Sequence, residues 1–321
     1  HVALGQLVAA LAFRCLSRLP TAAKTMPKIV AAVVVFHPQL ERLQAQFAAL
    51  LPQVDSIVIV DNGSDKAVPV WARQWPVPQV HCIWLGHNMG IAFAQNQGIE
   101  WAAAAGASHA LLMDHDSVPE KDMVAQLMSA ITMLPLAGAV GPCYADSRRA
   151  QKKSPFVRTT GLRRTRLDCS TSGPVLEVDH LIASGCLIPM DVLARVGRMR
   201  EDFFIDFVDV EWCLRARFEG HPVYGVCTAR LEHRLGDEPV KFLGREYLTH
   251  SPRRHYFHVR NAVLLYREPW VPLNWKLVSA SRLVLKMGFH VLVTPPRLQH
   301  LARIASGFLH GLLGRTGAAP D

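Results

Sequence analysis

The stretch Ile29–Phe36 reads IVAAVVVF, and it decides the fold class. A continuous apolar run rich in β-branched residues is typical of a strand that helices cover on both faces. Further buried strands are predicted at 56–60 (SIVIV) and 80–85, with a helix over 39–51 after the first strand. Because strands alternate with helices, the sequence predicts a mostly parallel α/β sheet that binds ligands at the C-terminal ends of its strands.

The same alternation continues downstream. An Ala-rich helix is predicted over 90–105, and a short strand at 110–113 precedes a helix over 120–134. Residues 146–168 contain eight Lys and Arg without periodicity, which predicts a mobile loop. Order is expected again at 178–189 and in a helix around 208–219. No G-x-G-x-x-G follows the first strand, which argues against a standard dinucleotide-binding fold.

The net charge is concentrated near the C-terminus. The 321 residues carry a formal charge of +9, and residues 240–321 hold twelve Lys and Arg against three acidic residues. Such a surplus favours an anionic partner, either a membrane surface or nucleic acid. A nucleic-acid-binding protein is the non-enzyme alternative, but it explains none of the motifs below. We therefore expect no nucleic acid as partner.

Three regions are predicted: an extension over 1–27, an α/β domain over 28–268 and a basic helical tail over 269–321. The apolar run of the extension is too short to span a bilayer, and we expect it to precede a natural start at Met26. In the tail, Arg282, Lys286 and His290 recur at i,i+4 spacing, which is typical of an amphipathic helix lying on a membrane. A packed helix pair or a homo-oligomer interface is the alternative.

The cysteines are widely spaced and odd in number, and no C-x-x-C pair occurs. We therefore expect reduced thiols, mostly buried, in a cytosolic protein. The seven positions are Cys15, Cys82, Cys143, Cys169, Cys186, Cys213 and Cys227.

Two aspartates end the strand at 110–113, in the stretch LLMDHDS. Side chains two apart on a strand point to the same side, so Asp114 and Asp116 can face one ligand. Oxygen ligands of this kind suit Mg²⁺ or Mn²⁺, which in turn bridges phosphate oxygens. The alternative is a helix capping box, S-x-x-E, from Ser117 to Glu120. That box leaves both aspartates unexplained.

Two glycine-containing turns follow neighbouring strands. In VDNGS, Asp61 forms either an Asx turn or an acceptor for the ring N–H of a pyrimidine base. In GHNMG, Asn88 is expected to cap the next helix, and Gly90 allows close backbone approach. A phosphate site at this helix N-terminus is the functional alternative.

The stretch 203–215, FFIDFVDVEWCLR, leads carboxylates into an apolar helix. Asp206 is predicted as the N-cap, and Glu211 is placed to pair with Arg215. Asp209 has no evident structural role, and an exposed carboxylate there could act as a general base. His233, in LEHR, is either a packing residue or a metal or phosphate ligand.

Taken together, these motifs occur in an order that resembles the inverting glycosyltransferases of family 2 with the GT-A fold. Within the family, the pattern is most similar to bacterial dTDP-L-rhamnose rhamnosyltransferases. The resemblance covers about Lys28 to Arg267. It rests on VVVFHP, VDNGS, GHNMGIAFAQNQGI, LLMDHDSVP, SGCLIP, FIDFVDVEWCLRA, GVCTARLEHRLGD and RRHYFHVRNAVLLYR.

The resemblance implies a donor site. Asp61 would contact the pyrimidine, and Asn88 and Gly90 would line the nucleotide pocket. Asp114 would lie near the ribose, and Asp116 would hold Mg²⁺ or Mn²⁺. The implied donor is dTDP-L-rhamnose; a UDP-sugar, such as a galactofuranosyl or other hexosyl donor, is the runner-up.

The resemblance also implies a single displacement that inverts the anomeric configuration. Asp209 would be the catalytic base, Glu211 would orient the acceptor or the base, and His233 would be a metal ligand. Arg260 and Asn261 match a family pair to which the sequence assigns no role. Nucleotidyl transfer, a second enzyme class, would need a Gly-rich phosphate loop that the first strand lacks.

The implied acceptor is a glycan or a lipid-linked sugar in the synthesis of a cell-surface polysaccharide such as O-antigen, or of a glycolipid. With the basic tail, this predicts a cytoplasmic protein that is peripheral to the inner face of the bacterial inner membrane.

Overall fold

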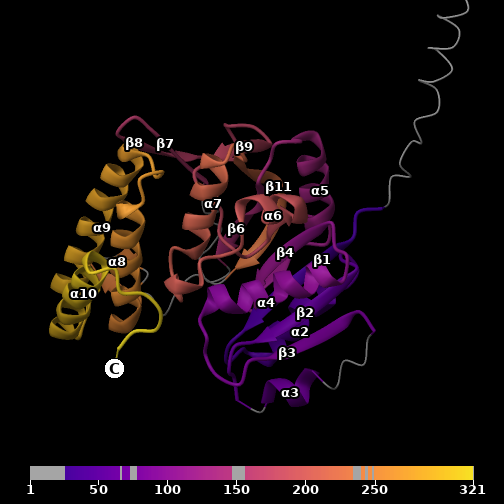
Figure 1. Cartoon of the computed structure of the whole chain (residues 1–321), viewed down its shortest axis with the longest axis horizontal. Helices are drawn as coiled ribbons and strands as arrows, with labels where there is room; N and C mark the ends of the chain where they lie inside the picture. Colours follow the sequence, from indigo (N-terminus) through magenta and orange to yellow (C-terminus); the bar gives the residue numbers. More distant parts are fainter. Residues whose placement is uncertain are drawn as a thin grey trace, which may run out of the picture.

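The computed structural model describes residues 26–65, 67–72, 78–146, 156–233, 240–242, 245–247 and 249–320 (Figure 1). The extension predicted over residues 1–27 lies almost wholly outside this part of the chain. The three predicted regions stay a prediction.

One mixed sheet of nine strands forms the core, in the order β3-β2-β1-β4-β10-β6-β11-β5, with β9 paired to β11. Four neighbouring parallel strands make up its first half: β1 (Ile29–Val35), β2 (Ser56–Asp61), β3 (Val80–Trp84) and β4 (His109–Asp114). All seven residues of β1 are buried, as its continuous apolar pattern predicts. The mostly parallel α/β sheet expected from the sequence is confirmed.

The second half of the sheet reverses direction. β10 runs antiparallel to both β4 and β6, whereas β11 runs parallel to β6 and antiparallel to β5 and β9. The bounds of these strands are β5 (Ser117–Pro119), β6 (Ala139–Asp146), β9 (Val175–Val178), β10 (Cys186–Pro189) and β11 (Val223–His233).

Helices cover both faces of the sheet (Figure 1). The alternating residues of β1 belong to two core clusters: the cluster of Ala32 includes side chains of α4, α6 and α7, and the cluster of Val33 includes side chains of α2, α3 and α5. Gly98 of α4 lies so close to β1 that an added Cβ would be 2.6 Å from the Ala32 Cβ. The helices are α2 (Leu40–Leu50), α3 (Ala67–Ala72), α4 (Ile91–Ala104), α5 (Met123–Met133), α6 (Met190–Val196) and α7 (Val208–Phe218).

Three C-terminal helices form a layer beside the sheet (Figure 1): α8 (Pro252–Arg267), α9 (Leu273–Val293) and α10 (Arg297–Leu312). Two glycines of α10 let it approach α8 closely. A Cβ at Gly307 would lie 2.5 Å from the Tyr256 carbonyl oxygen, and one at Gly311 would lie 2.7 Å from the Val263 Cβ.

The polar stripe of α9 does not face solvent along its length. Arg282 is exposed, but Lys286 is partly buried and His290 is 2% exposed. His290 packs with His255 of α8 and His300 of α10, whose Nδ1 atoms lie 2.9 Å apart. Because the imidazoles contact one another inside the helical layer, the opposite side of α9 faces outward, and it carries exposed apolar side chains such as Leu285 and Leu292.

A hairpin occupies part of the predicted mobile loop. β7 (Phe156–Thr160) pairs antiparallel with β8 (Arg163–Leu167) around Gly161, which has a φ of 56°. Phe156 is 6% exposed and anchors the hairpin, with its ring 2.5 Å from where a Cβ of Gly225 would lie. The loop prediction is therefore wrong for 156–167, and residues 147–155 lie outside the described part.

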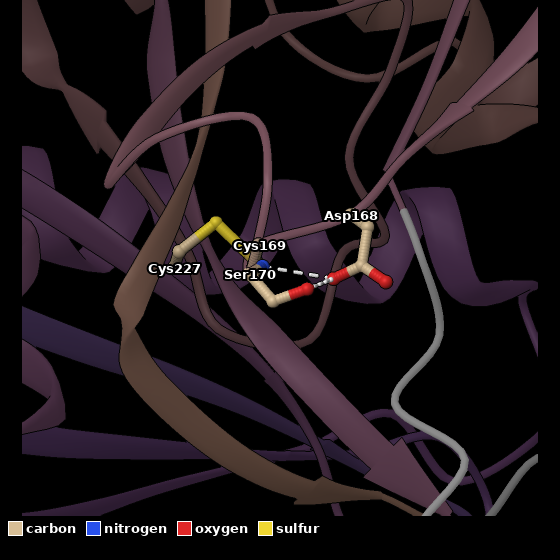
Figure 2. Close-up of a disulfide and its surroundings, with 4 residues drawn as sticks. All are labelled: Asp168, Cys169, Ser170 and Cys227. Carbon is tan, nitrogen blue, oxygen red and sulfur yellow. Dashed lines mark hydrogen bonds between the residues drawn. A yellow bond between two sulfur atoms is a disulfide. The ribbon is translucent and has the colours of Figure 1, made fainter.

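A disulfide joins Cys169 to Cys227, so the prediction that all cysteines are reduced is wrong for this pair (Figure 2). The two residues are 58 positions apart, and a hydrogen bond from the Cys227 amide to the Pro174 carbonyl holds their segments together. Beside the disulfide, Ser170 donates its amide and hydroxyl hydrogens to the Asp168 carboxylate. The free thiols in the described residues are Cys82, Cys143, Cys186 and Cys213.

Candidate active site

A cavity of about 670 Å³ opens at the C-terminal ends of β1, β2 and β4, the edge at which α/β sheets bind ligands. One wall contains Asn62, Asn88 and Gly90 from the turns after β2 and β3. The segment 204–209, which leads into α7, forms a second wall.

The turn after β2 is fixed by its own side chains. Asp61 is 4% exposed, accepts a hydrogen bond from the Ser64 amide, and does not line the cavity. This is the Asx-turn arrangement. Asn62 lines the cavity and donates to Asn88 Oδ1 at 3.1 Å. The sequence analysis did not single out Asn62, although its place in the D-N-G turn was the signal.

Gly90 brings the two walls together. Its φ of 90° is in the region that favours glycine, and an added Cβ would lie 2.7 Å from the Phe204 carbonyl oxygen. The first amide of α4, that of Ile91, donates to the same oxygen at 2.7 Å. Gly90 is the N-cap of α4, so the prediction that Asn88 caps it is wrong; Asn88 Oδ1 instead accepts from the Gly90 amide.

Two carboxylates and an imidazole converge at the acidic end of the cavity. One ligand atom each from Asp114, Asp116 and His233 lies within 4.8 Å of the others. β4 ends at Asp114, and Asp116 lies in the turn before β5, so the aspartates meet through that turn and not along one strand. His233 is the last residue of β11 and pairs in register with Ser117.

Buried hydroxyls hold this cluster. The Asp116 Oδ1 and His233 Nδ1 atoms lie 3.1 Å apart, and Ser117 Oγ lies 2.6 Å from the same nitrogen. Ser184 Oγ donates to Ser117 Oγ at 2.7 Å. The capping-box alternative is wrong, because Ser117 belongs to β5 and α5 begins only at Met123.

The side chains of the cluster shift one another's pKa values. Burial raises the pKa of Asp114. For Asp116, burial acts to raise the pKa, but the hydrogen bond and charge of His233 outweigh it and the pKa is lowered. For His233, burial acts to lower the pKa, but Asp116 outweighs it and the pKa is raised. Two carboxylates and an imidazole at this spacing fit a divalent cation, whose charge would relieve the cost of ionising Asp114.

The second wall of the cavity contains a strained turn. Phe204, Asp206 and Phe207 have φ values of 63°, 66° and 64°, a region that bulky residues rarely adopt. Asp206 does not cap α7, contrary to the prediction; the N-cap is Phe207, and Asp206 pairs with Arg254 at 3.2 Å.

Asn261 and Arg260 of α8 hold this turn. Both side chains are fully buried. Asn261 Nδ2 donates to the carbonyl oxygens of Phe203, Ile205 and Asp206 at 2.8, 2.7 and 2.9 Å. Arg260 donates to the Phe203 carbonyl at 3.0 Å and to Asn261 Oδ1 at 2.9 Å. The sequence assigned this pair no role, and its contacts show that it is structural.

Asp209 lines the cavity in the first turn of α7. Burial raises its pKa to about 6, assisted by the charges of Asp114 and Asp206 and opposed by a hydrogen bond from the Val210 amide. A carboxylate with this pKa accepts a proton readily near neutral pH.

Glu211 does not reach the cavity. Its side chain is fully buried and pairs with Arg215 at 2.8 Å, which confirms the expected i,i+4 contact. Arg215 also donates to the carbonyl oxygens of Val196 and Arg198. These contacts anchor α7 to the segment before η1 (Glu201–Phe203).

A cluster that can hold a divalent cation and a further carboxylate line one cavity at the binding edge of this α/β sheet, an arrangement that suits a metal-assisted group transferase. Residues 31–184 match the family described as Glycosyl transferase family 2. The chain belongs to this family and is a glycosyltransferase.

Among its relatives is the dTDP-rhamnosyl transferase RfbF of Shigella flexneri, 32% identical over 90% of this chain and 97% of the relative. The low-salt glycan biosynthesis hexosyltransferase Agl10 of Haloferax volcanii is 23% identical over 92% of this chain and 94% of its own. The N-acetylglucosaminyl-diphospho-decaprenol L-rhamnosyltransferase of Mycobacterium tuberculosis is 26% identical over 57% of this chain and 67% of its own.

Solved structures share the fold. TarS of S. aureus in complex with UDP-GlcNAc superposes with a TM-score of 0.58 at 12% identity, over 88% of this chain and 81% of that one. GalNAc-T7 with UDP, GalNAc and Mn²⁺ gives 0.60 at 11% identity over 90% of this chain. The present chain spans 56% of the GalNAc-T7 chain. At these identities the likeness shows the GT-A fold alone.

Proposed function

We propose that this chain transfers L-rhamnose from dTDP-L-rhamnose to a glycan or lipid-linked acceptor, with inversion at the anomeric carbon. The observation that carries the proposal is the shared cavity, which is lined both by the Asp114–Asp116–His233 cluster and by Asp209. The name of the Shigella relative supports the choice of donor.

In this proposal the chain positions both reactants. Asn62, Asn88 and Gly90 line the donor pocket, and the buried Asp61 stabilises the turn that presents Asn62. Asp209 accepts the proton of the acceptor hydroxyl as its oxygen attacks the anomeric carbon. No covalent intermediate is required, so a β-linked donor gives an α-linked product.

Asp116 and His233, with Asp114 beside them, would hold Mg²⁺ or Mn²⁺. When bound, such an ion neutralises charge on the departing nucleoside diphosphate. A structural neighbour crystallised with Mn²⁺ supports this assignment.

A donor panel tests the proposal. Purified protein is incubated with dTDP- and UDP-sugars, with Mg²⁺, Mn²⁺ or EDTA, alongside Asp116→Ala and Asp209→Asn. We expect metal-dependent turnover of dTDP-rhamnose that both substitutions abolish. A UDP-sugar is the second candidate donor, since TarS crystallised with UDP-GlcNAc; its selective turnover would overturn the rhamnose assignment. Absence of turnover with every donor would overturn the catalytic assignment.

We also propose that the helical tail rests on the inner face of the bacterial inner membrane, where a lipid-linked acceptor for cell-surface polysaccharide synthesis would be reached. Among the described helices, none has the length and hydropathy of a membrane span. However, large apolar side chains are exposed along α9 and α10: Leu285 is 75%, Leu292 72% and Leu298 81% exposed. Apolar residues on a basic helix pair suit an anionic lipid interface.

Vesicle flotation tests this placement. Leu285→Gln with Leu292→Gln is expected to reduce binding to phosphatidylglycerol-containing vesicles severalfold. Leu136→Gln, which replaces a side chain that is 67% exposed far from the tail in sequence, should leave binding unchanged. If the double variant floats like the parent and instead dissociates a dimer in sedimentation, the apolar face is a homo-oligomer interface and the membrane proposal fails.

A further inference from the structure

Gln95 of α4 is a buried polar residue that lines the cavity and lacks a partner. Its side chain is 3% exposed, and its Oε1 atom accepts no hydrogen bond. Within the part of the chain that the structure describes, its Nε2 atom donates none either. An unpaired buried amide is costly, so its presence in a binding cavity calls for a functional reason.

The next residue of the same helix shows a buried amide with all its partners. Asn96 donates to the Met199 carbonyl at 3.0 Å and to the Glu201 carboxylate at 2.8 Å, and its Oδ1 atom accepts from the Met199 amide at 3.0 Å. The packing of α4 therefore supplies partners on the side of Asn96, whereas no described residue supplies one to Gln95.

Gln95 lies in the wall between two cavities. It lines the cavity of about 670 Å³ one helical turn beyond Ile91, which lines the same cavity beside Gly90. It also lines a second cavity of about 10 Å³, together with Asp209. Because the second cavity is so small, Gln95 and Asp209 lie close together, and Asp209 lines both cavities as well.

The small cavity does not supply the missing partner. A space of about 10 Å³ has room for about one water molecule, and a buried water needs about two to four polar partners. Apart from Gln95 and Asp209, the lining side chains are apolar groups, cysteines and Trp212, whose indole N–H is already bonded to the Gly197 carbonyl. The partner of Gln95 must therefore come from the larger cavity, where the substrates bind.

A carboxamide is suited to a hydroxyl group. It offers an acceptor oxygen and two donor hydrogens without net charge, and a hydroxyl can both donate and accept. Since no contact fixes the amide of Gln95, rotation about its last side-chain bond can present either the oxygen or the nitrogen to the larger cavity. A phosphate, in contrast, is bound most strongly by charged donors.

The position of Gln95 indicates which hydroxyl it meets. Asn88 and Gly90 line the proposed nucleotide end of the cavity, and Asp209 is the proposed base. The transferred sugar must lie between them, because its anomeric carbon joins the diphosphate and is attacked by the oxygen that Asp209 deprotonates. We propose that Gln95 hydrogen-bonds a ring hydroxyl of the transferred sugar and so helps to select the donor. This inference rests on the proposed transferase function and assigns a specificity-determining residue to that reaction.

Donor titration tests the inference with Gln95→Met, which keeps the length of the side chain and removes the amide. dTDP and dTDP-L-rhamnose are each titrated with Mn²⁺ into the full chain by calorimetry, without acceptor. We expect Gln95→Met to weaken binding of dTDP-L-rhamnose about tenfold and binding of dTDP less than about twofold. Gln97→Met is the matched control, since Gln97 lies on the same helix, bonds to Glu100 at 3.3 Å and does not line the cavity. It should leave both affinities unchanged.

Urea denaturation adds an independent measurement. Because Gln95→Met replaces an unpaired buried amide with an apolar side chain of similar size, the unfolding midpoint should stay the same or rise. A lower midpoint would mean that the amide has a structural partner such as a bound water, and it would overturn the inference. Equal weakening of dTDP and dTDP-L-rhamnose would overturn it in favour of a nucleotide contact. Unchanged affinity for both would overturn it as well.

The same titrations with UDP and UDP-GlcNAc separate this inference from the rhamnose assignment. If the sugar strengthens binding to the wild type only in the UDP pair, the rhamnose assignment falls, and Gln95→Met should remove the gain in that pair instead. If dTDP-L-rhamnose is turned over and Gln95→Met leaves its affinity unchanged, the role of Gln95 falls alone. If the sugar strengthens binding in neither pair, the inference is overturned, because a hydrogen bond to the sugar should add affinity.

Discussion

Replacing Asn261 with alanine should lower the rate of catalysis much more than it lowers the stability of the fold. One side-chain amide group, with two N–H bonds, serves three backbone carbonyls of the turn before α7. The Phe203 carbonyl keeps a partner in Arg260, but no other hydrogen bond is recorded for the Ile205 and Asp206 carbonyls among the described residues. Alanine therefore leaves two backbone acceptors unpaired in a partly buried turn.

The expected loss of stability follows from these contacts. Leaving a buried acceptor without a partner costs roughly 1–3 kcal/mol. The turn is free to relax its positive φ values, each of which stores about 1 kcal/mol or more, so part of the cost is recovered. We expect the free energy of unfolding to fall by about 2–3 kcal/mol. With a urea m-value of about 3 kcal/mol/M, the unfolding midpoint should shift down by about 1 M.

The relaxation that limits the loss of stability should harm catalysis more. Asp209 follows the turn directly, and a displacement of about 1 Å of a reacting group can cost about 100-fold in rate. We expect kcat for sugar transfer to fall about 100-fold, while the donor KM changes much less. Urea denaturation and steady-state kinetics measure both effects. Asn274→Ala is the matched control, because it removes one amide hydrogen bond, to Gly161, from a partly exposed residue of α9.

A kcat within about twofold of wild type, together with the predicted midpoint shift, would refute the reasoning. It would mean that Arg260 and the packing of Phe204 on Phe257, whose ring centroids are 5.2 Å apart, are sufficient to hold the turn. Equal losses of activity in Asn261→Ala and Asn274→Ala would likewise show that the effect is not local.

Three further predictions follow from single contacts. The rate of transfer should fall about tenfold per pH unit below about pH 6, because Asp209 must be ionised to accept a proton and its pKa is raised to about 6. A pH–rate profile measures this fall, and the residual rate of Asp209→Asn should not show it. Gly90→Ala should lower donor affinity, measured by titration with dTDP, because its Cβ would clash with the Phe204 carbonyl oxygen; Gly106→Ala, at an open site of similar φ, is the control, and equal effects would contradict the argument. Cys227→Ser should lower the free energy of unfolding by about 4 kcal/mol, from loss of a crosslink that closes a loop of 58 residues, and a reducing agent should have the same effect on the wild type but none on the variant.

The sheet was predictable because each of its first strands is marked by a continuous run of apolar residues in the local sequence. The run at Ile29–Val35 is buried throughout, and the helix bounds of α2, α4 and α7 differ from the expected ranges by one or two residues. The hairpin of β7 and β8 was missed because its strands, FVRTT and RRTRL, are partly or fully exposed apart from Phe156, so no apolar periodicity marks them.

The contacts of the site were harder to predict because they join distant segments. The disulfide links positions 58 apart, and nothing in the spacing of the cysteines selects Cys169 and Cys227. The predicted N-cap at Asp206 was wrong because the chain enters α7 through residues with positive φ. This conformation is held by hydrogen bonds from the distant Asn261, so the local sequence does not show it. The predicted pairing of Glu211 with Arg215 was correct. Its absence from the cavity lining could not be predicted, because the face of α7 that meets the cavity depends on how the helix packs.

The strained turn connects the two halves of the proposed reaction. Its Phe204 carbonyl accepts a hydrogen bond from the first amide of α4, next to Gly90, and its Asp206 carboxylate accepts one from Arg254. The turn then passes directly into Asp209. A shift of the segment 204–209 would therefore change the wall beside Gly90 and the position of the base together. Since Asn261 and Arg260 of α8 fix it from behind, the helical layer contributes to catalysis by positioning the turn, and substitutions at the α8–α10 interface should lower kcat without touching either substrate.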